Sequence, residues 1–393
     1  MTLPKLSISV EKGGLGGVPT SQDGIAAMIH TGVAISGKLK LKEPYSLFSL
    51  ADAEALGINK TDHPRSYHDI SSFFETAGEG SELWILWVGE TETFTNILGT
   101  TSEIAKKLVE GAGGRIRLLG ISHLEKSGGS VVAASEGLKG KIHDAVPLAQ
   151  AFASYFAKKN QPLHIILSGN ELTSLTDLKD YSSASHTRVS LLIGGTQVGT
   201  KAANLGLVLG QLSGLPVQRS LARVKNGSLP VSKATFSNGE IVEKHVGKFE
   251  NLHAKRYLFL RTYIGQVGYF FADDLNLSSA SEDISTIADS RVIDKVIRLA
   301  YQTYVTEIGE EISVDENGKL AQAHIKYLEG KMENVLNETM TSKGEISQAI
   351  AFIDPDQNVL STNEVEVIIQ ITKVGYAKNI TIKIGFINPQ ISS

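Results

Sequence analysis

Short apolar strands alternate with amphipathic helices through the first half of the chain, and this rhythm constrains the fold more than any other feature. The segment ELWILWVG at 82–89 is apolar and strand-sized, and the amphipathic segment at 145–159 is followed by LHIILSG at 163–169. RVSLLIGG at 188–195 is followed in turn by a helical pattern at 202–214. Such runs predict buried strands, and their alternation with helices predicts an α/β layer architecture with some parallel pairing.

The pattern changes after about residue 240. A hairpin, two long helices and a further strand are expected at 257–272, about 284–308, about 320–340 and 363–374. On the first of these helices, an apolar stripe with 3.6-residue spacing lies opposite a charged face formed by Arg291, Asp294, Lys295 and Arg298. We therefore expect an α/β domain at 20–245 and an α+β domain at 246–375.

Each end of the chain carries a short alternating pattern. Within 376–393 the apolar positions are Ile380, Ile382, Ile384 and Phe386. Within 1–19 they are Leu6, Ile8 and Val10, and a flexible glycine joint follows at Gly13, Gly14, Gly16 and Gly17. Alternation of this kind predicts half-buried strands, although chain ends usually fray unless another segment holds them. Which sheet these two strands join is therefore the central question.

Composition limits the class of protein. An apolar content of 41% and a charged content of 20% are ordinary for a folded globular chain, and the net charge of −4 gives no support for nucleic-acid binding. No apolar run is long enough to span a bilayer, and the first residues lack the layout of a signal peptide, so we expect no membrane anchoring. The absence of cysteine excludes disulfides and thiolate metal sites.

The strongest candidate for binding chemistry is GGTQVGTK at 194–201. It follows a predicted strand and precedes a predicted helix, as the phosphate-binding loop G-x-x-x-x-G-K-[ST] does. The order after Gly199 is Thr200-Lys201, whereas that loop requires lysine before the hydroxyl residue. The swap displaces both the phosphate-binding ammonium and the metal-binding hydroxyl. We therefore favour a glycine-rich strand-to-helix turn, with a nucleotide-binding α/β enzyme as the alternative.

No catalytic, cofactor-binding or metal-binding set stands out elsewhere. His63 and His68 have a spacing that fits metal templates poorly, and the serines at 278–285 lack a nucleophile-elbow context. Two adjacent carboxylate pairs give no sign of convergence: Asp273 with Asp274, and Glu310 with Glu311. We expect no cofactor, no metal and no enzymatic activity, which shifts the weight toward a structural or assembly role.

The order of several segments resembles that of contractile tail sheath proteins, the family of phage sheaths, R-type bacteriocins and contractile injection systems. Residues 20–58 and 67–88 are similar to the opening of these proteins. Residues 202–227 resemble the stretch in which a small-residue helix ends before an lPVhrs-like sequence, and RVIDKVIRLAYQTYV, from Arg291, is similar to the sheath C-terminal region. Each motif is degenerate, so their order carries the resemblance, which covers nearly the whole chain.

The resemblance implies a structural subunit that polymerises helically around an inner tube and contracts to drive the tube through a target envelope. It implies an outer domain at 20–245, an inner domain at 246–375 joined by residues 1–19, and an outgoing C-terminal arm at 376–393. Strand arms would be donated to neighbouring subunits, beside an acceptor strand carrying Val365, Val367, Ile369 and Ile371.

The implied partners are other copies of the chain, the inner tube protein, and baseplate and terminator proteins. No nucleic acid is implied. The implied location is the cytoplasm of the producing cell during assembly, and then the virion tail or the injection particle.

Overall fold

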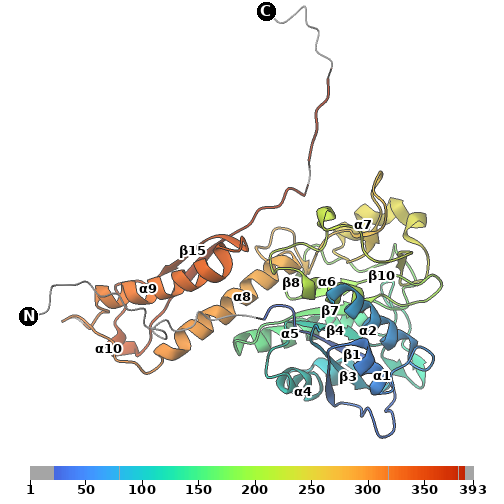
Figure 1. Cartoon of the computed structure of the whole chain (residues 1–393), viewed down its shortest axis with the longest axis horizontal. Helices are drawn as coiled ribbons and strands as arrows, with labels where there is room; N and C mark the ends of the chain where they lie inside the picture. The colour runs from blue at the N-terminus through green and yellow to red at the C-terminus, as the bar shows by residue number, and fades with distance from the viewer. Residues whose placement is uncertain (1–21, 79, 317, 379, 386–393) are drawn as a thin grey trace, which may run out of the picture.

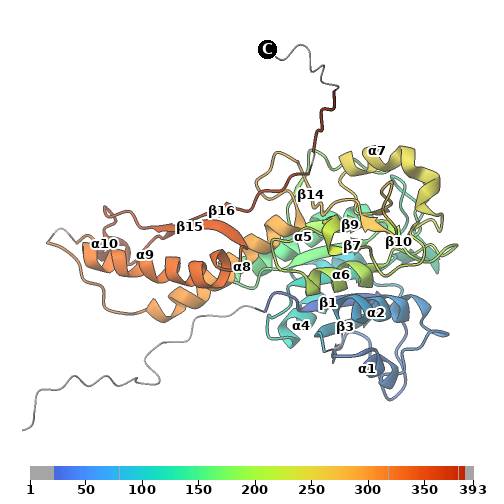
Figure 2. The ribbon, with the colours of Figure 1, turned by 45° about the horizontal axis from the view of Figure 1, so that its top comes forward.

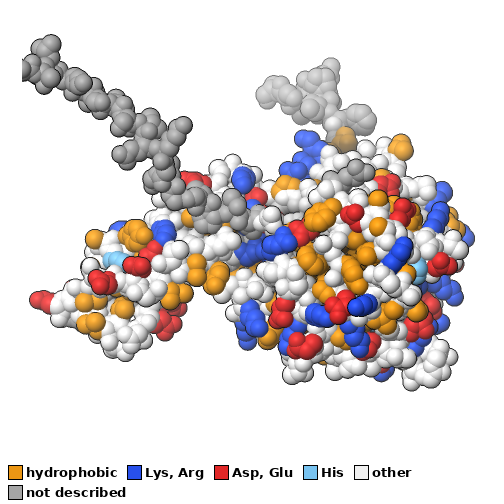
Figure 3. Space-filling view, turned by 60° about the horizontal axis from the view of Figure 1, so that its bottom comes forward, with side chains coloured by type: hydrophobic (Ala, Val, Ile, Leu, Met, Phe, Trp, Pro, Cys, Tyr) orange, Lys and Arg blue, Asp and Glu red, His pale blue; other side chains and the backbone are white. Residues whose placement is uncertain are grey.

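The computed structural model describes residues 22–385 except residues 79, 317 and 379. Figure 1 shows a large α/β unit and a smaller unit of helices and strands that projects from it along α8 (Ile287–Tyr304). Figure 3 shows the smaller unit as a separate lobe. Several predicted arm and hinge residues lie outside the described residues: Leu6, Ile8, Val10, Gly13, Gly14, Gly16, Gly17 and Phe386.

A six-stranded sheet forms the centre of the large unit. Its order is β2-β3-β1-β4-β7-β9, and all neighbours are parallel except β2, which runs antiparallel to β3. The strands are β1 (Ala26–Thr31), β2 (Pro44–Leu47), β3 (Leu83–Val88), β4 (Leu118–Ser122), β7 (His164–Ser168) and β9 (Val189–Leu192). The residues of β4, β7 and β9 are all buried, as expected for strands covered on both faces. The α/β prediction is confirmed.

Helices cover both faces of the sheet (Figures 1 and 2). One face carries α2 (Pro64–Ala77), on which α1 (Leu50–Ala55) packs, and α6 (Leu205–Gly214); the other carries α3 (Phe94–Leu98), α4 (Ile104–Gly111) and α5 (Ile142–Lys158). The sequence starts and stops these helices locally. Ser49 caps α1 in a capping box with Asp52, and α2 begins at a proline and ends before Gly78.

Glycines on α6 allow it to approach α2 closely. A Cβ atom at Gly206 would lie 1.7 Å from the backbone oxygen of Asp69, and one at Gly210 would lie 1.9 Å from Thr76 Oγ1. Both distances are far below van der Waals contact, so only glycine fits. Helix packing therefore accounts for the glycine content of this helix without any ligand.

Residues 246–287 complete the core of the large unit. The predicted hairpin is present: β12 (Leu260–Arg261) pairs antiparallel with β13 (Phe270–Phe271). Leu258 bridges to Leu192 at the edge of the main sheet, and the core cluster of the sheet continues to Ile287. This core therefore groups 246–287 with the first unit, whereas the sequence analysis placed the boundary after residue 245. Short strands pair across long sequence separations here, and local periodicity does not carry that information.

The remaining short elements lie in the same unit, apart from one turn after α8. They are β5 (Lys126–Ser127), β6 (Ser130–Val131), β8 (Ser185–His186), β10 (Gly194–Gly195), β11 (Thr235–Phe236), α7 (Phe249–Ala254), β14 (Leu277–Ser278), and 3-10 turns at Val224–Asn226, Val242–Lys248 and Val305–Glu307.

The smaller unit packs two long helices against a two-stranded sheet. After α8 come α9 (Gln322–Leu336), which continues into a π turn (Asn337–Thr341), β15 (Ile346–Phe352), α10 (Val359–Thr362) and β16 (Ile368–Lys373). The apolar stripe of α8 meets α9 and the sheet in a core that includes Val292, Leu299, Met332, Leu336 and Ala351. Both predicted long helices are confirmed, with shorter bounds.

The charged face of α8 joins the two units. All four of its members are buried: Arg291, Asp294, Lys295 and Arg298. Lys295 Nζ lies 2.8 Å from Asp23 Oδ2 and 2.7 Å from Glu345 Oε2, so the lysine links both units. Arg188 of the large unit pairs with Asp294. The polar face of this helix therefore meets buried counter-charges, where its local pattern alone would place it in solvent.

Candidate assembly interface

The strands β15 and β16 form an antiparallel pair on the surface of the small unit. Three of the predicted acceptor residues are partly buried against the core made by α8 and α9: Val367, Ile369 and Ile371. The fourth, Val365, packs on an adjacent small cluster. All four side chains therefore turn toward the core of the small unit, and each is only partly covered.

The two edges of this pair differ. On the outer side of β15, the N–H of Ala351 donates to Glu333 Oε1 of α9 at 3.0 Å. The N–H of Ile353 donates to Glu329 Oε1, also at 3.0 Å. Residues directly opposite in an antiparallel pair orient their backbone groups alike, so Ile369, opposite Ala351, turns its N–H and C=O away from β15.

Among the described strands, none pairs with this outer edge of β16. One edge of the sheet is therefore closed by glutamates, and the other presents backbone donors and acceptors where a third strand would lie.

From residue 380 onward the described chain extends away from both units (Figure 1). Ile380, Ile382 and Ile384 are 79%, 76% and 94% exposed. Residues 380–385 belong to no strand and make no backbone hydrogen bond to another described residue. Within the described residues, the alternating pattern therefore finds no partner sheet in its own chain.

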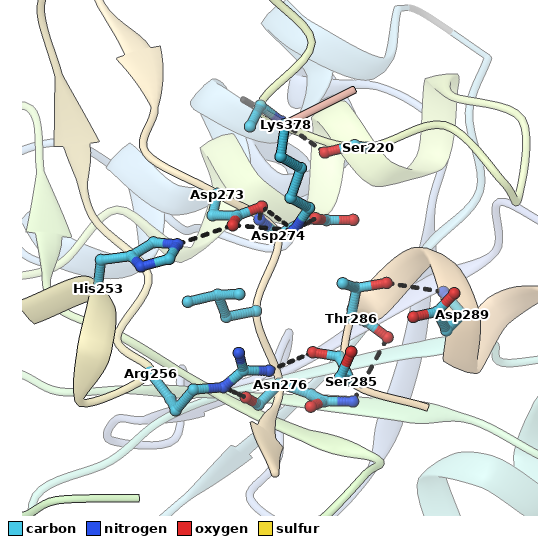
Figure 4. A network of polar contacts seen from close by, with 12 residues as sticks. Ser220, His253, Arg256, Asp273, Asp274, Asn276, Ser285, Thr286, Asp289 and Lys378 are labelled. Atoms are coloured by element: carbon cyan, nitrogen blue, oxygen red, sulfur yellow. Dashed lines mark hydrogen bonds and ion pairs between the residues drawn. The ribbon is translucent and has the colours of Figure 1, made fainter. Parts of the chain in front are cut away.

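Two lysines hold the root of this segment against the large unit, and Figure 4 shows the contacts of one of them, Lys378. Lys378 Nζ lies 2.8 and 2.9 Å from the two carboxylate oxygens of Asp273, and 3.9 Å from Asp274 Oδ1. Lys373 Nζ, at the end of β16, lies 3.1 Å from Asp289 Oδ1 in the first turn of α8. A cavity of about 360 Å³ is lined both by this strap, residues 373–378, and by the large unit.

Asp273 and Asp274 ionise differently although they are adjacent. Burial opposes the charge on Asp273, but the hydrogen bond with His253 Nε2 at 2.8 Å and the charge of Lys378 outweigh it and lower its pKa. Burial and the charge of Asp273 raise the pKa of Asp274 to about 7. Asp273 is therefore the main anionic partner of Lys378. Lys378, which completes this contact, comes 105 positions after Asp273 in the sequence.

The acidic side of this contact is held firmly. Arg256 Nε donates to the backbone oxygen of Asn276 at 3.1 Å, and the same guanidinium also binds the backbone oxygen of Ser285 (Figure 4). Thr286 Oγ1 accepts the N–H of Asp289 at 3.0 Å and caps α8. The loop that carries Asp273 and Asp274 into α8 is thus fixed by buried hydrogen bonds.

The glycine loop before α6 lacks the geometry of a phosphate site. The N–H groups of Leu205 and Gly206 donate to Asp69 Oδ1 at 2.9 and 3.3 Å, and that of Leu207 donates to Asn204 Oδ1 at 2.9 Å. In a phosphate loop, free N–H groups at the helix N-terminus bind the anion. Here a carboxylate already occupies them, so the nucleotide-binding alternative is not favoured.

The other chemical candidates have structural surroundings. His63 packs on Trp87 with ring centroids 5.0 Å apart, and His68 Nε2 lies 2.9 Å from Thr196 Oγ1. Among the described residues, no group of three or more histidine or carboxylate side chains is arranged to hold a metal ion. A search of the described helices found none that is long and apolar enough to cross a membrane.

Sequence reasoning missed the residues that organise this interface, Glu329, Glu333 and Lys378. In the sequence each is an ordinary charge on a helix or near the chain end. Each acts through a partner far away in the sequence, so no local pattern marks it.

Similar proteins were found among solved structures, whereas no curated protein sequence matches this chain. The contracted helical sheath of the anti-feeding prophage has a TM-score of 0.66 at 12% identity, covering 98% of this chain and 99% of that chain. The contracted sheath complex of PVC, an extracellular contractile injection system, has a TM-score of 0.61 at 12% identity, covering 99% and 100%. A chain of the anti-feeding prophage baseplate in its contracted state has a TM-score of 0.63 at 11% identity and covers all of both chains. The resemblance to sheath proteins is confirmed at the level of fold.

Two family models also match nearly the whole chain. The model of the DUF2586 N-terminal domain matches residues 3–275, and that of the DUF2586 C-terminal domain matches residues 283–391. The gap between the two matches, residues 276–282, lies just before α8, close to where the core of the large unit ends. The chain belongs to the DUF2586 family and has the fold of contractile sheath proteins.

Proposed function

We propose that this chain is a structural subunit of a contractile sheath, which polymerises helically around an inner tube and contracts to drive the tube through a target envelope. One observation carries the proposal: the same molecule holds an open strand edge at β16 and an exposed apolar arm at Ile380–Ile384. Each feature alone is an aggregation hazard. As partners in a polymer, they give a directional contact between copies, and the sheath fold over the whole chain supports this.

The arm suits addition to a sheet. Ile380, Ile382 and Ile384 fall on one face of an extended chain, and the partly buried Ile369 and Ile371 would lie beside them on the acceptor. Backbone hydrogen bonds supply affinity in such contacts, and the alternation fixes the register. A head-to-tail contact that does not close on itself builds a helical filament.

The other elements receive roles by extension. The alternating segment predicted near the N-terminus, with the glycines that follow it, is proposed as a second link to a neighbour. The large unit is proposed as the outer domain of the sheath, and the small unit, with α8 and α9, as the inner domain facing the inner tube protein. Baseplate and terminator proteins would contact the ends of the polymer, as a chain of similar fold occurs in a baseplate structure.

Contraction of such a polymer requires no catalytic site, because interfaces formed in the contracted state supply the energy. We propose that the protein is not an enzyme. The proposed location is the cytoplasm of the producing cell during assembly, and afterwards the tail or injection particle.

Electron microscopy of the purified chain, alone and co-expressed with its tube protein, tests the proposal. Long cylinders or contracted tubes are expected. A monodisperse particle with the mass of one chain in both preparations would contradict the sheath function. Calorimetric titration with ATP and GTP tests the enzyme alternative, for which we expect no heat of binding.

A deletion separates assembly from folding. Removing residues 379–393 takes away the exposed arm and leaves every described core contact in place. We expect an unchanged melting temperature and no tubes. A truncated chain that still polymerises would refute the role of the arm.

A further inference from the structure

The C-terminal strap is attached to the large unit at two points. Lys373, the last residue of β16, contacts Asp289. Lys378 contacts Asp273 and Asp274 (Figure 4). Between these points the strap lines a cavity of about 360 Å³, and Tyr376 within it is 45% exposed. Charge contacts at the ends, more than apolar packing along the strap, therefore hold it in place.

The second attachment fixes how much chain is available to the arm. With Lys378 held, only residue 379 separates the attachment from Ile380, the first apolar position of the arm. With Lys378 released, the last fixed residue is Lys373, and residues 374–379 become linker, which is six residues. Six extended residues span at most about 20 Å. The contact therefore decides between an arm with almost no slack and one that can swing freely.

We propose that Lys378, with Asp273 and Asp274, is a releasable latch that sets the length of the arm linker in the polymer. The latch rests on the sheath function proposed above. It is closed in the subunit that assembles, where it aims the arm, and it opens on contraction. When the arm of one subunit is bound to a neighbour, a change in the orientation of the two subunits must be accommodated by the linker between the last fixed residue and the arm. A linker of one residue is too short for that, whereas a linker of six residues is long enough.

The surroundings of Lys378 fit a contact that opens. The lysine side chain is 45% exposed, and water and salt weaken pairs in such positions. Both acidic partners are buried, and Asp273 remains paired with His253 Nε2 at 2.8 Å when the lysine leaves. Opening the latch therefore changes the position of the strap without disturbing the large unit.

Distance measurements in the free subunit test whether the latch exists. The chain has no cysteine, so Ala377→Cys on the strap and Glu250→Cys on α7 carry the only two spin labels. Pulsed electron paramagnetic resonance should give one narrow distance distribution. Lys378→Gln should lose that narrow peak, whereas Lys383→Gln, which removes the same charge farther along the arm, should keep it. An unchanged peak in Lys378→Gln, or equal loss in both variants, would overturn the latch.

The same labels in tubes test whether it releases. Labelled subunits are diluted with unlabelled ones, so that only distances within one chain are measured. The narrow peak should persist in extended tubes and be lost in contracted ones. The same narrow peak in both forms would overturn the release. If no tubes form at all, the sheath function and with it the release fail, while the free-subunit measurement still decides whether the strap is latched.

Discussion

Replacing Ile382 with aspartate should strongly weaken assembly without affecting the fold of the subunit. The side chain is 76% exposed, so nearly all of its burial energy is available to a contact with another molecule. Burying an isoleucine contributes about 1.5–3 kcal/mol, and an unpaired charge on the buried face costs more. A loss of at least about 2 kcal/mol of binding free energy per contact lowers the association constant of that contact roughly 30-fold. The critical concentration for tube formation should rise by at least that factor.

The assay is sedimentation of tubes over a range of protein concentrations, with thermal melting of the unassembled subunit alongside. Thr381→Asp is the matched control, because it places the same charge on the opposite face of the arm, where the neighbouring positions of β16 are exposed. The control should assemble nearly as the original chain does, and both variants should melt at the original temperature. Equal assembly of Ile382→Asp and the original chain would refute the reasoning, as would equal loss in the two variants.

Three further predictions concern the subunit itself, each measured by urea unfolding. Gly206→Ala should lower the free energy of unfolding by about 3 kcal/mol or more, because the new Cβ would lie 1.7 Å from the backbone oxygen of Asp69. Gly330→Ala on α9, where a new Cβ meets no atom within 4 Å, should raise the free energy of unfolding by up to about 1 kcal/mol. Equal effects of the two substitutions would contradict the close packing of α6 on α2. Glu333→Ala should lower the free energy of unfolding by about 1–3 kcal/mol, because it leaves the N–H of Ala351 without its acceptor. Glu333→Gln keeps an acceptor oxygen and should retain most of the stability. Equal losses in the two variants would argue against the hydrogen bond between Glu333 and β15. Burial raises the pKa of Asp69 from 3.8 to about 7, so between these pH values the folded state keeps a proton that the unfolded state releases. The free energy of unfolding should therefore fall as pH rises from about 4 to about 7. Asp69→Asn should make this pH dependence less steep, and an unchanged pH dependence would contradict the raised pKa of Asp69.

Local pattern predicted several elements of the large unit. The apolar runs at 82–89 and 163–169 form central strands, as predicted, and Ser49, directly before the helical residues 50–55, caps α1. These elements are encoded by side chains within a few residues of each other. Their existence therefore follows from periodicity and capping alone.

Features that depend on distant surfaces could not be predicted. Arg298 reads as a solvated charge on an amphipathic helix, and it is buried because Asp23, 275 positions earlier, supplies its counter-charge. The contact on the outer edge of β15 likewise depends on Glu333 of α9, 18 positions before Ala351 in the sequence. The alternation in the arm predicted a strand but did not indicate which sheet it joins. The structure shows that residues 380–385 are exposed and form no backbone hydrogen bond with another described residue of their own chain.

The most direct test of the account is a helical reconstruction of the assembled tubes at a resolution that traces the arm. We predict that residues 380–386 pair with the outer edge of β16 in a different subunit, with Ile382 turned toward the core of the acceptor. Tubes in which these residues pair with β16 of their own chain, or lie unpaired on the surface, would contradict the central claim.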